Sequence, residues 1–362
     1  DIIRFINGKK IREVGEFRRV ISNALSRRFE NAAIGLLRSS LLKRFESSIN
    51  SFSLTLGKLI RSYKFFIESL DNERVPLREF FQEFINIDDD EAIERMLEDE
   101  KKFDDASKYD VDKLRADLEN DLAVLSYFKS ETEQIDIHSS SKLAELSKLL
   151  KTVIEKAERD AIDEEDARQK RKVMVFSYFE ETVDWIVKYL GEVLENDPEL
   201  APYKHRLAVA SGGRDYWEGL SRDKVISSFA PISTQAREGT EDKFDLVICT
   251  DVLAEGLNLQ QCRNIINYDL PWNPNKLEQR MGRIHRIGQK RNVYYYNFTM
   301  DPEKTIDGYI FARLLDKIEN IKLAMDDKVY DIIGSLVKQE DIAKMYEALS
   351  KIPKEQWKPK ID

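Results

Sequence analysis

Two continuous apolar runs, residues 245–250 and 264–269, constrain the fold of this chain more than any other feature. Neither run alternates with polar residues, which is typical of strands buried on both faces of a parallel sheet. Ligands of an open parallel sheet bind beyond the carboxyl ends of its strands. Thr250 and Asp251, at such an end, therefore mark a candidate binding site.

Helical and strand patterns alternate around these runs. Short apolar runs predict further strands at residues 173–176, 207–210 and 292–298. Helices are predicted over 180–194, near 222–229 and after an N-cap among the serines at 139–141. Strands that alternate with helices predict an α/β fold with a parallel sheet.

The flanking regions have helical periodicity, with apolar residues three and four positions apart from 34 to 66 and again within 304–350. Fourteen basic and five acidic residues lie in 1–64, whereas fifteen acidic and six basic residues lie in 88–121, which we interpret as a charged helix. We expect a helical region over 1–138, an α/β domain over 139–300 and a C-terminal helical extension over 301–362.

Residues 279–291 carry five cations and no acid. Arg280, Arg283 and Arg286 are three residues apart, and Lys290 and Arg291 follow them. On a helix this spacing would align the three arginines along nearly one face, where they repel one another unless an anion shares the field. A solvated basic face is the alternative, but such a face usually pairs Arg with Glu four residues away.

In these two segments the chain resembles the C-terminal ATPase lobe of superfamily-two helicases, specifically the Swi/Snf-type DNA translocases. Residues 250–259, Thr-Asp through Glu-Gly-Leu-Asn-Leu, match motif V of that family, and residues 279–289 match motif VI. The Arg-Ile-Gly-Gln ending of residues 286–289 separates the Swi/Snf type from RNA helicases. The resemblance implies a RecA-like second lobe over 139–300, preceded by a helical insertion between two lobes.

The resemblance also implies a nucleotide site. Arg283 and Arg286 resemble the arginine fingers that reach the γ-phosphate of ATP held by the first lobe, a contact that suits a planar guanidinium. Gln279 leads motif VI and corresponds to a residue that couples to the first lobe. Gly256 and Asn258 match the part of motif V near the nucleotide, where many relatives carry Asp at the position of Asn258.

Four residues after predicted strands resemble positions that contact the nucleic-acid backbone: Thr250, Ser177, Ser211 and Gly212. The alternative for the serines and glycine is an ordinary turn. Residues 36–48 resemble a helix that some bacterial Swi/Snf-like proteins carry between the lobes. Its Lys43 and Arg44 are candidates to face a phosphate track while the apolar stripe packs inward.

The sequence contains no phosphate-gripping loop of the form Gly-x-x-x-x-Gly-Lys-Ser/Thr. We therefore expect half of a motor that is inactive alone, with ATP and Mg²⁺ held mainly by a first lobe absent from this chain. The expected partners are double-stranded DNA through its backbone, the N-terminal RecA-like lobe of the same protein, and a protein target.

Other classes of protein are not supported. No run of eighteen apolar residues and no signal pattern occurs, so we expect a cytoplasmic protein, nucleoid-associated if bacterial, and no membrane partner. Cys249 and Cys262 form no Cys-x-x-Cys pair and the three histidines are scattered, which predicts buried free thiols and no metal site.

The function expected is that of an ATP-dependent double-stranded-DNA translocase that remodels protein–nucleic-acid complexes. One alternative is a lobe of a strand-separating RNA or DNA helicase, against which the ending at residues 286–289 argues. The other is a non-catalytic DNA-binding scaffold. The presence of Gln279, Arg283 and Arg286 argues against a scaffold, which needs no interface arginines.

Overall fold

The computed structural model describes residues 32–77, 102–212, 216–251, 258–271, 274–286 and 288–299, and in the first helix it describes side chains from Ser40 onward. These residues belong to two compact units. Ile49–Ile135 lie in the first unit, and the residues up to Ser48 and from Asp136 onward lie in the second. The predicted extension over 301–362 lies outside the described residues.

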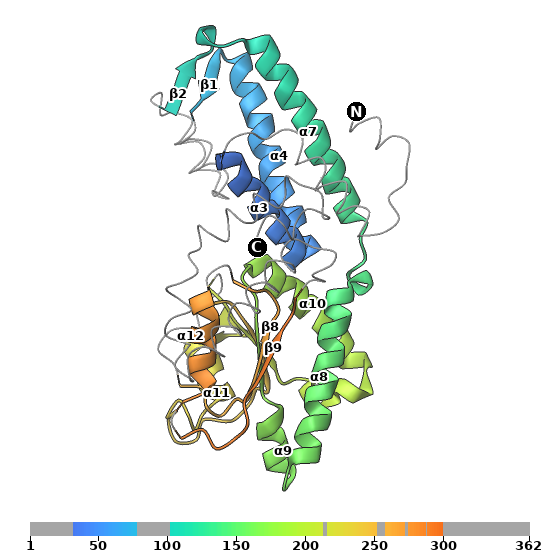
Figure 1. Cartoon of the computed structure of the whole chain (residues 1–362), viewed down its shortest axis with the longest axis vertical. Coiled ribbons are helices and arrows are strands. Elements are labelled where there is room, and N and C mark those ends of the chain that lie inside the picture. Colours follow the sequence, from blue (N-terminus) through green and yellow to red (C-terminus); the bar gives the residue numbers. More distant parts are fainter. Residues whose placement is uncertain are drawn as a thin grey trace, which may run out of the picture. The chain divides into compact units, whose positions relative to one another are not determined.

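A five-stranded sheet is the centre of the second unit (Figure 1). Its strands, in spatial order, are β4 (Leu207–Ala210), β7 (Leu246–Cys249), β3 (Val173–Phe176), β8 (Asn264–Asn267) and β9 (Tyr294–Asn297). All neighbouring pairs are parallel. The three inner strands are buried along their whole length, which explains the apolar sequences of β3 and β7 and the isoleucines in the middle of β8. The predicted α/β fold with a parallel sheet is confirmed.

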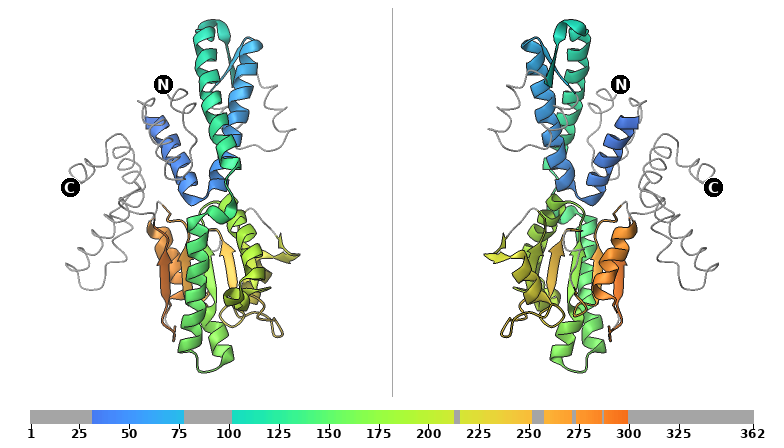
Figure 2. Two further views of the ribbon diagram at one scale, coloured as in Figure 1. Left: turned by 90° about the vertical axis from the view of Figure 1, so that its right-hand side faces the viewer. Right: turned by 90° about the vertical axis from the view of Figure 1, so that its left-hand side faces the viewer.

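Helices cover both faces of this sheet (Figure 2). Side chains of α8 (Ser141–Asp160) and α10 (Glu180–Asn196) pack with Val173 and Val175 of β3. The next side chains along β3, Met174 and Phe176, point to the opposite face and pack with α11 (Arg222–Phe229) and with Ile284 at the end of α12 (Pro274–Ile284). Successive residues of one strand thus contribute to two separate cores.

Polar side chains cap the starts of several helices, and the cap of α8 lies among the serines where the sequence predicts it. The Ser140 side chain accepts a hydrogen bond from Leu143 N at the start of α8, and Ser221 accepts one from Lys224 N at the start of α11. Asp163 caps α9 (Glu164–Arg171), which leads into β3. Local chemistry alone therefore positions these helix starts.

The apolar stripe over 34–66 is not one helix. It comprises α3 (Ala32–Ser47), in the second unit, and α4 (Ile49–Asp71), in the first. The first unit also contains β1 (Arg74–Pro76), β2 (Phe103–Asp105), which is antiparallel to β1, and α7 (Val111–Glu133). Helices α4 and α7 pack side by side (Figure 1), and Thr132 Oγ1 of α7 donates to Ser53 Oγ of α4 at 2.9 Å.

The expectation of a charged helix over 88–121 is wrong for the first described residues of that stretch, which form β2 and a 3-10 turn at Ala106–Lys108. The stretch is helical only from the start of α7, which Asp110 caps through Lys113 N. The predicted division of the chain at residues 138 and 300 stays a prediction. In the described ranges, no helix is both long enough and apolar enough to cross a membrane.

Candidate functional site

Thr250 and Gly212 meet at the carboxyl edge of the sheet. Thr250 follows β7 and Gly212 follows β4, the strand next to it. The backbone N–H of Gly212 donates to Thr250 Oγ1 at 3.1 Å. Parallel strands end at the same edge, so these two predicted contact residues are brought together although 38 positions separate them.

Ser177 and Ser211 also lie at this edge, but both side chains are fully buried. Ser177 Oγ donates to a carboxylate oxygen of Asp269, and Ser211 Oγ donates to one of Glu180. The two serines therefore follow β3 and β4 as predicted, and each hydroxyl is hydrogen-bonded to a carboxylate of the protein. Their contact with a nucleic-acid backbone stays a prediction.

Asp269, which follows β8, is the centre of a buried polar network. Its carboxylate accepts hydrogen bonds from Lys142 Nζ at 2.8 Å, from Ser47 Oγ at 2.7 Å and from Ser177 Oγ. Burial alone would raise the pKa of Asp269, but the Lys142 ammonium and these hydrogen bonds hold that pKa below its usual value. Asp269 is not among the site residues predicted from the sequence, although an acid at the end of a buried strand is a usable signal.

The end of α3 docks on this network. Ser47 Oγ lies 2.6 Å from Thr182 Oγ1, and Lys142 Nζ donates to the Ser47 carbonyl at 3.3 Å. Arg44 Nη1 forms an ion pair with Glu181 at 3.0 Å, and its guanidinium carbon lies 4.7 Å from the centre of the Phe179 ring.

Arg44, predicted to face a phosphate track, thus packs α3 against α10 through a half-buried ion pair. Lys43, the other basic residue of this prediction, is half-buried. The DNA contact proposed for both residues stays a prediction.

The structure corrects the expectation that the cations of residues 279–291 lack an acid. Arg280 is fully buried, and its Nη2 lies 2.6 Å from Asp251 Oδ1. Arg280 Nη1 donates to Asn267 Oδ1 at 2.7 Å, and the guanidinium carbon lies 4.8 Å from the centre of the Phe176 ring. The neutralising acid comes from 29 positions earlier in the chain, beyond the reach of a local pattern. Arg291 likewise lies 3.8 Å from Asp166.

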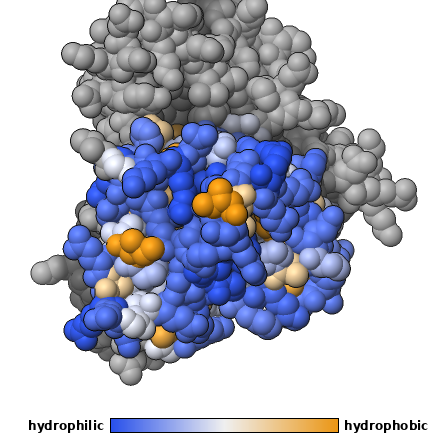
Figure 3. Space-filling model, turned by 90° about the horizontal axis from the view of Figure 1, so that it is seen from below, coloured by the Kyte–Doolittle hydropathy of each residue, from blue (hydrophilic) through white to orange (hydrophobic). Residues whose placement is uncertain are grey.

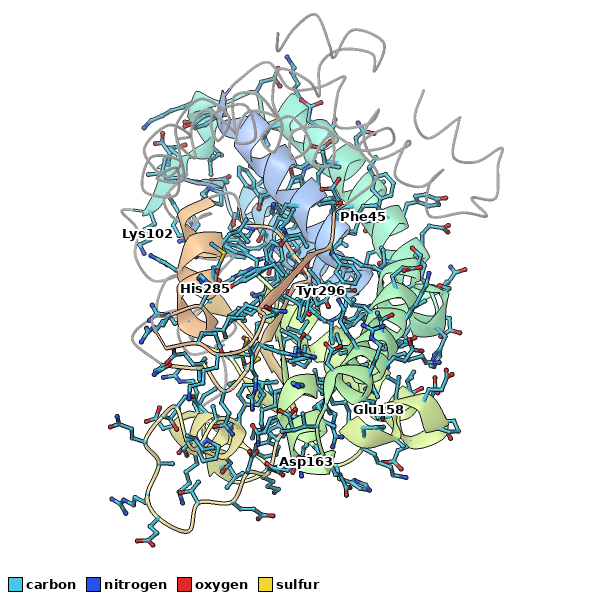
Figure 4. The ribbon with its side chains drawn as sticks, turned by 60° about the horizontal axis from the view of Figure 1, so that its bottom comes forward. Phe45, Lys102, Glu158, Asp163, His285 and Tyr296 are labelled. Carbon is cyan, nitrogen blue, oxygen red and sulfur yellow. The ribbon has the colours of Figure 1, made fainter. Side chains whose placement is uncertain are left out.

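Arg286 has a different environment. Helix α12 ends at Ile284, so the expectation of three arginines on one helical face is wrong for Arg286. Its side chain is exposed, and its Nε donates to the Gly282 carbonyl at 2.8 Å. Within the part of the chain that the structure describes, no acidic side chain pairs with Arg286. His285, labelled in Figure 4, directly precedes it and is also exposed.

The other predicted residues of motif VI, Arg283 and Gln279, both belong to α12. Arg283 is half-buried and Gln279 is exposed. Their roles at a lobe interface stay predictions.

Hydrogen bonds join the segments that match motifs V and VI. Leu259 N donates to the Arg283 carbonyl at 3.0 Å, and Gln260 Nε2 donates to the Arg286 carbonyl at 3.1 Å. Gln289 Nε2 returns to the Gln260 carbonyl at 2.8 Å. Asn258 Oδ1 accepts from Gln260 N at 3.2 Å, which holds the first segment in a turn. Gly256, the other predicted nucleotide contact, lies outside the described residues.

The two cysteines are buried free thiols, as predicted. Burial raises the pKa of the Cys262 thiol to about 12. Neither sulfur lies where it could act as a nucleophile, because both are fully enclosed in the core below α11 and α12.

Part of the chain is similar in sequence to known helicases. The model of the helicase conserved C-terminal domain matches residues 141–288. The uncharacterized ATP-dependent helicase YqhH of Bacillus subtilis (strain 168) is 38% identical over 159 residues, which are 43% of this chain and 24% of that protein. The RNA polymerase-associated protein RapA of Vibrio cholerae serotype O1 (strain M66-2) is 40% identical over 84 residues, 22% of this chain and 8% of RapA.

Among solved structures, the chain is similar to the C-terminal part of the Fun30 ATPase domain. The match covers 65% of this chain and 61% of the Fun30 chain, with 21% sequence identity and a TM-score of 0.36. The chain spans about a quarter of the length of YqhH and less of RapA.

Proposed function

Because residues 141–288 match the model of the helicase conserved C-terminal domain, we propose that the chain carries the second RecA-like lobe of a Swi/Snf-type protein and is half of an ATP-dependent motor. The motor is a double-stranded-DNA translocase that remodels protein–nucleic-acid complexes. In it, ATP and Mg²⁺ are held mainly by a first lobe, and this lobe supplies arginine fingers. The observation that carries the proposal is the hydrogen-bonded joint of motifs V and VI, beside which Arg286 is exposed.

The contrast between two arginines supports the assignment. Arg280 is buried, and Asp251 neutralises its guanidinium. Asn267 accepts a hydrogen bond from the same group. That side chain therefore holds α12 on the sheet. Arg286 is exposed, and a planar, permanently charged guanidinium in that position suits the charge that develops on a transferred phosphoryl group.

The nucleic-acid side of the proposal uses the same sheet edge. Thr250, the predicted backbone contact, directly precedes Asp251, and Asp251 holds both Arg280 and Lys276 of α12. A movement of Thr250 when its hydroxyl binds a DNA phosphate would pass through the peptide bond to Asp251. From Asp251 it would reach α12 through the two ion pairs. This connection favours a motor in which DNA binding and ATP turnover are coupled, rather than a scaffold.

The test uses the full-length protein. We expect Arg283→Ala and Arg286→Ala each to lower ATP turnover by roughly a thousandfold or more, the range known for the loss of an arginine finger. DNA affinity should change by less than about twofold, because neither guanidinium contacts DNA in this proposal. Lys290→Ala is the matched control, since it removes one exposed charge from the same segment and should retain turnover.

Three results would contradict the proposal in different ways. Near-normal turnover in Arg286→Ala would remove the finger assignment. Separation of duplex strands by the unmodified protein, in place of translocation along an intact duplex, would favour a strand-separating helicase. Tight DNA binding without any ATP turnover would favour a scaffold.

A further inference from the structure

Tyr178 presents a large ring to solvent at the carboxyl edge of the sheet. Its side chain is 46% exposed, whereas the residues on either side, Ser177 and Phe179, are buried. In the described part of the second unit, the other large hydrophobic residues with this much exposure are Ile162 and Ile232. They lie in the connections that precede β3 and β7, at the amino edge, and Tyr178 lies at the opposite edge, just after β3.

The amino edge, seen from below in Figure 3, is largely hydrophilic with isolated hydrophobic residues. An exposed apolar side chain of this scattered kind needs no explanation by itself. Tyr178 differs because of how its surroundings hold it.

The backbone and ring of Tyr178 are held in place from two sides. Its N–H donates to a carboxylate oxygen of the buried Asp269 at 3.3 Å. Its ring meets the Phe179 ring nearly edge to face, with centroids 5.0 Å apart and an interplanar angle of 82°. A ring held in this way loses little conformational entropy when it binds a ligand.

Two cations flank the pair of rings. Lys276 Nζ lies 5.3 Å from the centre of the Tyr178 ring, and the Arg44 guanidinium carbon lies 4.7 Å from that of Phe179. We call Arg44, Phe179, Tyr178 and Lys276 the aromatic strip. Rings flanked by cations are typical of surfaces that follow a nucleic-acid strand, where aromatic faces contact bases or sugars.

Two acids pair with the cations of the aromatic strip and so determine how the strip contributes to nucleic-acid binding. Arg44 pairs with Glu181 at 3.0 Å, and Lys276 pairs with Asp251 at 3.1 Å. Because both cations are already paired, binding at the strip releases few counterions from DNA phosphates. Its contribution to affinity therefore comes from the exposed ring.

We propose that the Tyr178 ring is a contact residue for a nucleic-acid strand and packs against a sugar or base face beside Thr250. The inference rests on the proposed function, since it requires that this lobe binds nucleic acid. It adds an aromatic contact to the backbone contacts of that proposal.

The experiment measures DNA affinity of this chain by fluorescence anisotropy over a series of salt concentrations. A duplex and a single strand of the same mixed sequence are the probes. Stacking on one aromatic ring is worth roughly 1–3 kcal/mol, so Tyr178→Ala should weaken binding by about 5- to 150-fold. The slope of log affinity against log salt should not change. Tyr178→Phe, which keeps the ring, should bind as the unmodified chain does.

Ile162→Ala and Ile232→Ala remove comparably exposed apolar side chains from the amino edge and should leave affinity unchanged. Melting temperatures of all variants confirm folding. A larger loss on the single strand assigns the contact to a base face, and equal losses on both probes assign it to a sugar; both results support the proposal.

Normal affinity in Tyr178→Ala overturns the proposal. So does a shallower salt slope in Tyr178→Ala, which would mean an ionic effect, or a Phe variant as weak as the Ala variant, which would mean a hydroxyl contact. If the unmodified chain binds neither probe, the proposed function itself fails. If the unmodified chain binds DNA with a steep salt dependence and Tyr178→Ala has the same affinity, only the proposed aromatic contact is refuted.

Discussion

Two identical side chains six residues apart have opposite environments in this protein. Arg280 points from α12 into the sheet and meets Asp251, Asn267 and the Phe176 ring. Arg286 follows the end of α12 and is exposed. Helix geometry explains the difference, because only residues within the helix are held on its buried face.

At this scale we predict that the two arginines have separable effects on stability. Arg280→Ala should lower the free energy of unfolding by about 3 kcal/mol, the lower end of the range for a broken buried ion pair, because Lys276 still faces Asp251. Arg286→Ala should change it by less than about 0.5 kcal/mol, as expected of an exposed residue. Urea unfolding of this chain, followed by circular dichroism, measures both. Equal losses in the two variants would show that Arg286 also has a structural role.

Helix α3 illustrates how an element is positioned. Its sequence predicts a helix with an apolar stripe and basic residues, but the side chains of its last turn bind residues far along the chain. Ser47 bonds to Asp269, 222 positions away, and Arg44 to Glu181, 137 positions away. The network around Asp269 thus attaches α3 to the ends of β3 and β8.

We predict that Asp269→Asn releases the end of α3. The amide keeps an acceptor but leaves the half-buried Lys142 ammonium without its counter-charge, which should lower the free energy of unfolding by about 3 kcal/mol. Hydrogen exchange at residues 41–47 should accelerate more than at β3. Glu192→Gln is the control, because the exposed Glu192–His138 pair should contribute less than about 1 kcal/mol.

The same variant has a signature in pH. The pKa of Asp269 is lowered in the folded state, so its contribution to stability is present above the unfolded value near pH 4 and is lost as the pH falls through the folded pKa. Urea unfolding from pH 5 downward should therefore show a shallower loss of stability in Asp269→Asn than in the unmodified chain. Equal pH dependence, or uniform exchange across α3 and β3, would argue against this role for Asp269.

At the scale of the molecule, the second unit brings the residues of two predicted sites to one sheet. The ends of β4 and β7 provide the predicted backbone contacts, and α12 with the following segment provides the arginines. Asp251, beside the end of β7, joins the two sets of residues through its ion pairs with Lys276 and Arg280 of α12.

We predict that this chain binds double-stranded DNA with little preference for sequence and with a steep dependence on salt. Each phosphate contact removed should lower the slope of log affinity against log salt by roughly 0.9. Lys43→Ala should show this change. Lys148→Ala, on the exposed part of α8, should not, although it removes the same charge. Sequence-selective binding with little dependence on salt would refute the prediction.

Local patterns in the sequence predict a large part of this architecture. Short apolar runs predict β3, β4, β7 and β8 to within two residues, because the central residues of a strand buried on both faces are apolar. A serine cap predicts where α8 begins. The spacing of residues 250–259 and 279–289 identifies the helicase domain, since these motifs are themselves local.

Only the tertiary structure decides which charges remain available to a ligand. The sequence shows five cations without a nearby acid, but folding brings Asp251 to Arg280 and Asp166 to Arg291. It also assigns α3 to the sheet and buries the hydroxyls of Ser177 and Ser211 against carboxylates. Periodicity reports the environment along one helix or strand, whereas burial and ion pairing depend on segments that meet only in the folded chain.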